Sequence, residues 1–113
     1  MRIQVKGRNG ATVDDELLSR VEKKLAKVSR QVSPLAVLEI ELREERNPAI
    51  KDSQVAEATL HLKGVTLRAR ESSTDMGHSI NMMADDLARQ VKKHRDKRRA
   101  RREAHKGAQE RLA

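Results

Sequence analysis

Arginine and lysine side chains gather in the last quarter of the chain, where their density suits the binding of anions. From Arg89 to Ala113 there are 11 basic and 3 acidic residues, so this segment carries the whole formal net charge of +8. Residues 1–88 hold 14 basic and 14 acidic residues and are therefore neutral. Such a basic run repels itself and attracts polyanions. The expected partner is a nucleic acid, an anionic membrane surface or an acidic protein.

A second group of cations repeats at helical spacing within residues 20–30, where Glu22 is the only acid. A solvated basic face is ordinary on an isolated helix. Beside a second basic helix, the imbalance favours one broad surface that binds phosphates. The predicted binding residues are Arg20, Lys23, Lys24 and Lys27 in this group, and Arg89, Lys92, Lys93, Arg95, Lys97, Arg98 and Arg99 in the C-terminal group.

Side chains that carry catalysis or hold metals are absent or scattered. The chain has no cysteine, which excludes disulfides, thiolate nucleophiles and Cys-ligated metals. The adjacent acids Asp85 and Asp86 point apart on a helix, and no glycine-rich phosphate loop is present. The four histidines fall on different elements, at His61, His78, His94 and His105. We expect no enzyme, no metal, no cofactor and no small-molecule substrate.

The absence of Phe, Tyr and Trp limits how the chain could bind nucleic acid. Without aromatic platforms it cannot stack splayed bases, so contacts should go to phosphates and to overall shape. A membrane surface is disfavoured, because no large apolar residue occurs from residue 92 to residue 111. No stretch is long and apolar enough to span a bilayer, and no signal sequence opens the chain, so a cytoplasmic location is expected.

Apolar periodicity predicts the elements that must position these cations. Alternation predicts strands at residues 1–7, 38–43, 56–63 and 65–70. Apolar residues three or four apart predict a helix over residues 13–30 with Thr12 as its N-cap, and a second helix after the capping candidates of residues 72–75. The stripe of this second helix consists of Met76, Ile80, Met83, Leu87 and Val91.

The element order β-α-β-β-β-α predicts an α+β fold, a two-layer sandwich in which two helices cover one face of a four-stranded sheet. The first two strands should be parallel through a right-handed crossover, and an antiparallel meander should follow. From Arg95 onward charges point in every direction and no face can be buried. We therefore predict a domain of residues 1–94 and a basic extension of residues 95–113, either an overhanging helix or disordered.

Three stretches point to a known family. They are the opening MRIQVKGRN, VEKKLAKV in the first helix, and D-M-x-x-x-I-N-x-x-x-D-x-L-A-R-Q-V-K-K-H-R in the second. From Met1 to Arg99 the chain resembles the ribosome hibernation-promoting factors, also called protein Y or ribosome-associated inhibitor proteins. The stretch from Asp75 to Arg95 is the most specific part.

The resemblance implies a function. Such proteins bind 16S rRNA at the decoding centre of the small ribosomal subunit, within the 70S ribosome, and exclude mRNA and tRNA. They thereby silence translation under stress. By position, the contacts fall on Lys23, Lys24 and Lys27 of the first helix and on Arg89, Lys92, Lys93 and Arg95 of the second.

Three positions of the second helix depart from the family pattern. Gly77, Asn81 and Asp86 stand where the family usually has Tyr, Asp and Lys. The basic end favours a short form with a tail over a fragment of a long form. A general double-stranded RNA-binding module, or a protein-interaction module with a basic tail, remains the alternative function.

Overall fold

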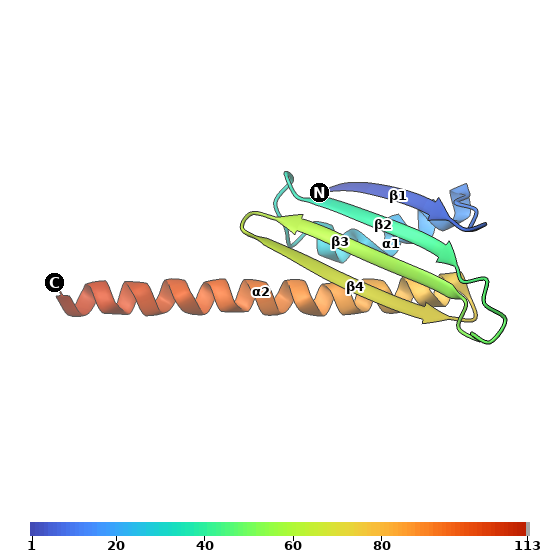
Figure 1. Cartoon of the computed structure of the whole chain (residues 1–113). Coiled ribbons are helices and arrows are strands. Elements are labelled where there is room, and N and C mark those ends of the chain that lie inside the picture. The colour runs from blue at the N-terminus through green and yellow to red at the C-terminus, as the bar shows by residue number, and fades with distance from the viewer. Residues whose placement is uncertain (113) are drawn as a thin grey trace.

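The computed structural model describes the backbone of residues 1–112 and the side chains of residues 1–105. Its elements follow the predicted order and are drawn in Figure 1. They are β1 (Arg2–Arg8), α1 (Asp15–Ser29), β2 (Val37–Glu44), β3 (Gln54–Leu62), β4 (Val65–Ser73) and α2 (Met76–Leu112).

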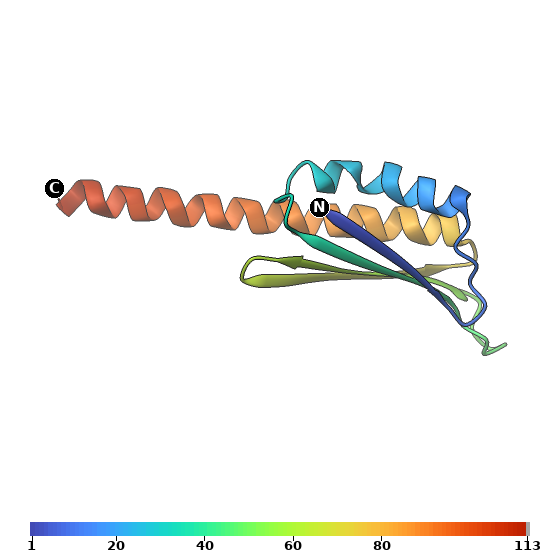
Figure 2. The same ribbon diagram turned by 90° about the horizontal axis from the view of Figure 1, so that it is seen from above.

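The four strands form one sheet in the order β1-β2-β3-β4. β1 runs parallel to β2, with Ile3 opposite Leu38, and the pairs β2–β3 and β3–β4 are antiparallel. Figure 2 shows both helices against one face of the sheet and the other face uncovered. This arrangement confirms the predicted α+β sandwich, its parallel first pair and its meander.

The core lies between that sheet face and the helices, and aliphatic residues build it. Leu38, Ile40 and Leu42 of β2 alternate inward, and Ala56, Ala58 and Leu60 do so on β3. Val21, Leu25 and Val28 of α1 are fully buried against them. The predicted stripe of α2 is also confirmed: Ile80, Met83, Leu87 and Val91 are at most 2% exposed, and Met76 is half-buried.

Both helices begin later than their earliest capping candidates. The N-cap of α1 is Asp14, whose Oδ1 accepts a hydrogen bond from the backbone N–H of Leu17 at 2.9 Å. The prediction of Thr12 was wrong, because a cap serves the N–H three residues ahead and the first turn starts at Asp15. At α2, Ser72 and Ser73 belong to β4, and Asp75 accepts from the N–H of His78 at 3.0 Å.

Replacing Asp14 with alanine should therefore lower the free energy of unfolding by about 1 kcal/mol, the usual cost of losing an N-cap. The variant Thr12→Ala is the matched control and should change stability by less than about 0.5 kcal/mol. Urea denaturation followed by far-UV circular dichroism measures both. The reverse ranking of the two variants would contradict the position of the cap.

α2 continues well beyond the part that packs on the sheet. Among the described side chains of α2, Val91 is the last buried one, and from residue 92 to residue 105 every side chain except the half-buried His94 is exposed. The 21 residues from 92 to 112 extend about 30 Å at 1.5 Å per residue, which gives the molecule its 65 Å long axis (Figure 1). We call this segment the overhang. The side chains of residues 106–113 in the predicted extension lie outside the described residues.

Candidate nucleic-acid interface

The two helices lie side by side on the sheet (Figure 2). Their polar sides form one basic surface. The apolar periodicity fixes this arrangement, because burying Val21 and Leu25 turns the intervening lysines outward. Lys23, Lys24 and Lys27 are exposed, and Arg20 is half-buried. All seven predicted cations of α2 are exposed. We call the predicted cations of α1 together with Arg89, Lys92 and Lys93 the two-helix surface.

Two hollows between the helices bring predicted residues together. One, of about 440 Å³, is lined by Glu16, Ser19, Arg20, Lys23 and Lys24 of α1 and by Asn81 of α2. We call it the inter-helix groove. In the second, Lys27 of α1 meets Arg89, Lys92 and Arg95 of α2 around a volume of about 390 Å³. Cations from the two helices can therefore contact the same stretch of a polyanion.

Three of the four remaining predicted cations line shallow hollows along α2 alone. Lys93 and Lys97 lie beside Arg89 and Lys92, and Arg99 lies beside Arg95 and Arg102. Arg98 lines none of these hollows and is exposed on the overhang. The cations of α2 thus continue the two-helix surface along the overhang instead of closing around a pocket.

Two carboxylates of α2 offset part of this charge. The Asp85 Oδ1 accepts a hydrogen bond from the Lys27 Nζ at 3.0 Å, which joins the helices. That bond and the charge of Lys27 hold the pKa of Asp85 below its usual value, and Lys24 and Arg89 contribute less. The Asp86 Oδ1 lies 3.8 Å from the Arg89 Nη2. A polyanion must therefore compete with Asp85 for Lys27.

The ion pair of Asp85 contributes little to stability. Because the pKa of Asp85 is lowered by folding, its contribution is present above the usual carboxyl pKa and is lost as the pH falls through the folded value. Both side chains are more than half exposed, so water screens the pair. Its main effect is on the charge that the two-helix surface presents.

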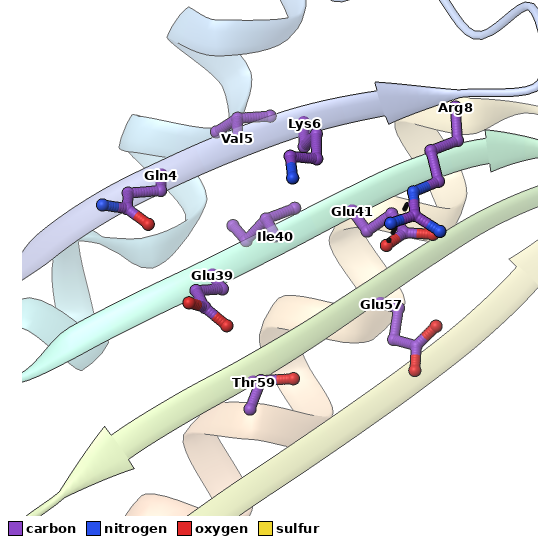
Figure 3. A pocket seen from close by; sticks show the side chains of 9 residues that line it. All are labelled: Gln4, Val5, Lys6, Arg8, Glu39, Ile40, Glu41, Glu57 and Thr59. Atoms are coloured by element: carbon purple, nitrogen blue, oxygen red, sulfur yellow. Dashed lines mark ion pairs between the residues drawn. The ribbon is translucent and has the colours of Figure 1, made fainter.

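On the uncovered face of the sheet, several charges are paired with one another. Figure 3 shows a hollow of about 520 Å³ there, in which Arg8 reaches toward Glu41 at 3.5 Å. Arg43 donates to Glu57 at 2.7 Å and to Glu45 at 3.2 Å, and the bond to Glu57 does most to raise the pKa of Arg43. An anion must therefore compete with these carboxylates for Arg8 and Arg43.

Two residues of the helical side were not among the predicted binding residues. Asn81 lines the inter-helix groove, and Gly77 lies one turn before it beneath the head of Arg20. Their spacing of four residues places them on one helix face, but no sequence pattern indicates that Arg20 reaches across to them. Within residues 1–105, no cluster of three or more His, Asp or Glu side chains could hold a metal ion.

Comparison with known proteins gives consistent matches. Residues 3–99 match the family described as sigma 54 modulation protein / S30EA ribosomal protein. A ribosome hibernation promotion factor from Picosynechococcus sp. is 32% identical over 98 residues, which are 86% of this chain and 50% of that protein. One from Staphylococcus aureus is 33% identical over 97 residues, 84% of this chain and 48% of that protein. The chain thus spans about half the length of these curated relatives.

Solved structures match over nearly their full length. The Thermus thermophilus Protein Y N-terminal domain superposes with a TM-score of 0.69 at 27% identity, covering 83% of this chain and 99% of that domain. A ribosomal subunit interface protein from Coxiella burnetii gives a TM-score of 0.67 at 24% identity, covering 85% of this chain and 99% of that one, and supports the fold alone. No helix among the described residues is both long and apolar enough to cross a membrane.

Proposed function

Because the chain belongs to the sigma 54 modulation protein / S30EA ribosomal protein family, as its resemblance predicted, we propose that it is a ribosome hibernation factor. It binds the 16S rRNA of the small subunit at the decoding centre, occupies the places of mRNA and tRNA, and silences translation in the cytoplasm. The chain acts by occupying a site, without catalysis. The 70S ribosome to which it is bound does not translate. Similarity to the ribosome hibernation promotion factors supports the coarser part of this proposal.

The observation that carries the proposal is the continuity of the basic surface. Cations of α1 and α2 meet in two hollows, and the exposed cations of α2 continue along the overhang. From residue 95 to residue 105 the side chains of the overhang are exposed, so this part can enter a channel while the domain fills a wider cleft. A molecule 65 Å long and only 28 by 18 Å across suits a cleft walled by phosphates.

Phosphate contacts of this kind predict how the binding responds to salt. Each neutralised phosphate releases counterions, and the logarithm of the binding constant falls by about 0.7 to 0.9 per contact for each decade of salt. Without aromatic side chains, stacking cannot replace these contacts. Binding to the ribosome should therefore be strongly weakened by salt.

Co-sedimentation with purified small subunits, with excess duplex RNA as competitor, tests the proposal. Retention on the subunits supports a defined ribosomal site. Loss to duplex RNA would show a general double-stranded RNA-binding module. Binding that survives nuclease treatment of the partner would show a protein-interaction module, because the basic surface would then contact protein.

Replacing Asp85 with asparagine should strengthen binding to small subunits a few-fold. The change removes the carboxylate charge that holds Lys27 and raises the net charge by one, while stability changes by less than about 1 kcal/mol because the pair is exposed. Fluorescence titration of labelled protein with subunits measures the affinity. Unchanged or weaker binding would mean that Lys27 does not contact RNA.

A further inference from the structure

The inter-helix groove differs from the rest of the basic surface because it combines cations of α1 with an amide side chain of α2. Arg20, Lys23 and Lys24 line it from α1 and Asn81 lines it from α2, with Glu16 as the only acid among the lining residues. In the second hollow Lys27 is already bonded to Asp85, and along the overhang the cations of α2 stand on an exposed helix. The groove therefore offers directed hydrogen bonds in addition to charge.

Gly77 sets the position of the Arg20 head. A Cβ atom at residue 77 would lie 2.6 Å from the Nη1 and 2.9 Å from the Cζ of Arg20, closer than real Cβ contacts allow. The guanidinium can therefore rest on the first turn of α2 only because residue 77 has no side chain. Gly77 itself is buried beneath it. An arginine held in this way loses less freedom when its planar fork meets a phosphate.

Asn81 presents its amide nitrogen to the same groove. Its Oδ1 is buried and has no hydrogen-bond partner, whereas its Nδ2 is neither buried nor bonded within the chain. A buried polar atom without a partner is uncommon in native proteins. Turning the amide around would bury two unbonded donors and place the oxygen in the groove. The observed orientation leaves the two N–H donors of Nδ2 available to an acceptor.

From this geometry we propose that the inter-helix groove is a subsite for one phosphate group of RNA. The Arg20 guanidinium and the Asn81 Nδ2 donate directed hydrogen bonds to phosphate oxygens, and Lys23 and Lys24 supply charge. Gly77 is a positioning residue, because its lack of a side chain leaves room for the Arg20 head against α2. The inference rests on the proposed function and adds two residues, Gly77 and Asn81, to the proposed binding surface.

The variant Asn81→Asp tests the subsite because it keeps the shape of the side chain and replaces its donors with a charged acceptor. Its affinity for purified small subunits should fall at least about tenfold, and the salt slope should fall by about 0.7 to 0.9, the value for one phosphate. Asn47→Asp is the matched control. It adds the same charge in the loop between β2 and β3 and preserves the acceptor of the Ala49 N–H, so it should change affinity less than about threefold.

The variants Gly77→Ala and Arg20→Gln test the positioning role. Gly77→Ala should weaken binding several-fold without lowering the thermal midpoint, since alanine favours helices and Arg20 can swing outward. The double variant should bind no more weakly than Arg20→Gln alone. Additive losses would overturn the positioning role.

Equal effects of Asn81→Asp and Asn47→Asp, or an unchanged salt slope, would overturn the subsite and leave the proposed function standing. An unchanged slope would indicate an acidic protein group in the groove instead of a phosphate. Failure of the wild-type chain to bind small subunits would overturn both proposals together.

Discussion

Reversing three charges at once, as Lys24→Glu, Lys92→Glu and Lys93→Glu, should abolish binding to the small ribosomal subunit while the fold stays intact. The three lysines lie on both helices of the two-helix surface, and each reversal replaces an attraction to phosphate with a repulsion. If each reversal costs about 1.4 kcal/mol of binding free energy, which is a tenfold loss of affinity, the three together should lower the affinity about a thousandfold. All three side chains are exposed, so the thermal midpoint should not change. Co-sedimentation and thermal denaturation measure the two effects.

The matched control reverses three lysines elsewhere, as Lys6→Glu, Lys51→Glu and Lys63→Glu. These side chains are exposed on β1, on the loop before β3 and on the turn after it, and the net charge changes equally. The control should lose much less affinity, because long-range attraction is screened beyond about 8 to 10 Å at ordinary salt. Equal losses would mean that net charge, and not the two-helix surface, governs binding. Co-sedimentation of the first triple variant with ribosomes would contradict the site itself.

Ending the chain after His94 should leave a stable domain that binds about a hundredfold or more weakly. The deletion removes eight basic and three acidic residues, which lowers the formal net charge from +8 to +3. The last buried residue, Val91, is retained, so the thermal midpoint should be unchanged. The salt slope should fall by about 0.7 to 0.9 for each phosphate that the shortened chain no longer neutralises. A large drop in the midpoint would contradict the predicted division into a domain of residues 1–94 and an extension.

A second variant separates the charge of the overhang from its length. Replacing Arg98, Arg99, Arg101 and Arg102 with glutamine keeps a good helix former at each position and removes four charges. If charge carries the effect, this variant should lose most of the affinity that the deletion loses. Retention of wild-type affinity would show that the overhang acts by occupying space.

The sheet and the two buried stripes could be predicted because each depends on a local repeat. Ile3 alternates on its strand with a period of two, and Ile80 to Val91 recur with a helical period, whatever their tertiary partners are. The start of α1 was harder to place, because Thr12, Asp14 and Asp15 are all possible N-cap residues and only backbone geometry selects Asp14. The helix beyond Val91 consists mostly of good helix formers. Helix propensity alone does not decide whether such a segment is helical or disordered.

The exposed cations of the interface could be predicted from the sequence, but the contacts between its two helices could not. The exposed cations follow from the polar side of each helix. The pairing of Lys27 with Asp85, 58 residues apart, depends on how the two helices pack, as does the position of Arg20 over Gly77. Gly77 and Asn81 stood out in the sequence only as departures from a family pattern. Their place in the groove required the structure.

The central claim is that the chain occupies the places of mRNA and tRNA on the small subunit. Its most direct test is the competition of a fluorescently labelled chain with mRNA and initiator tRNA for purified small subunits, in the presence of excess duplex RNA. We expect mRNA and tRNA together to displace the chain and duplex RNA to leave it bound. Simultaneous binding of the chain, mRNA and tRNA to one subunit would contradict it.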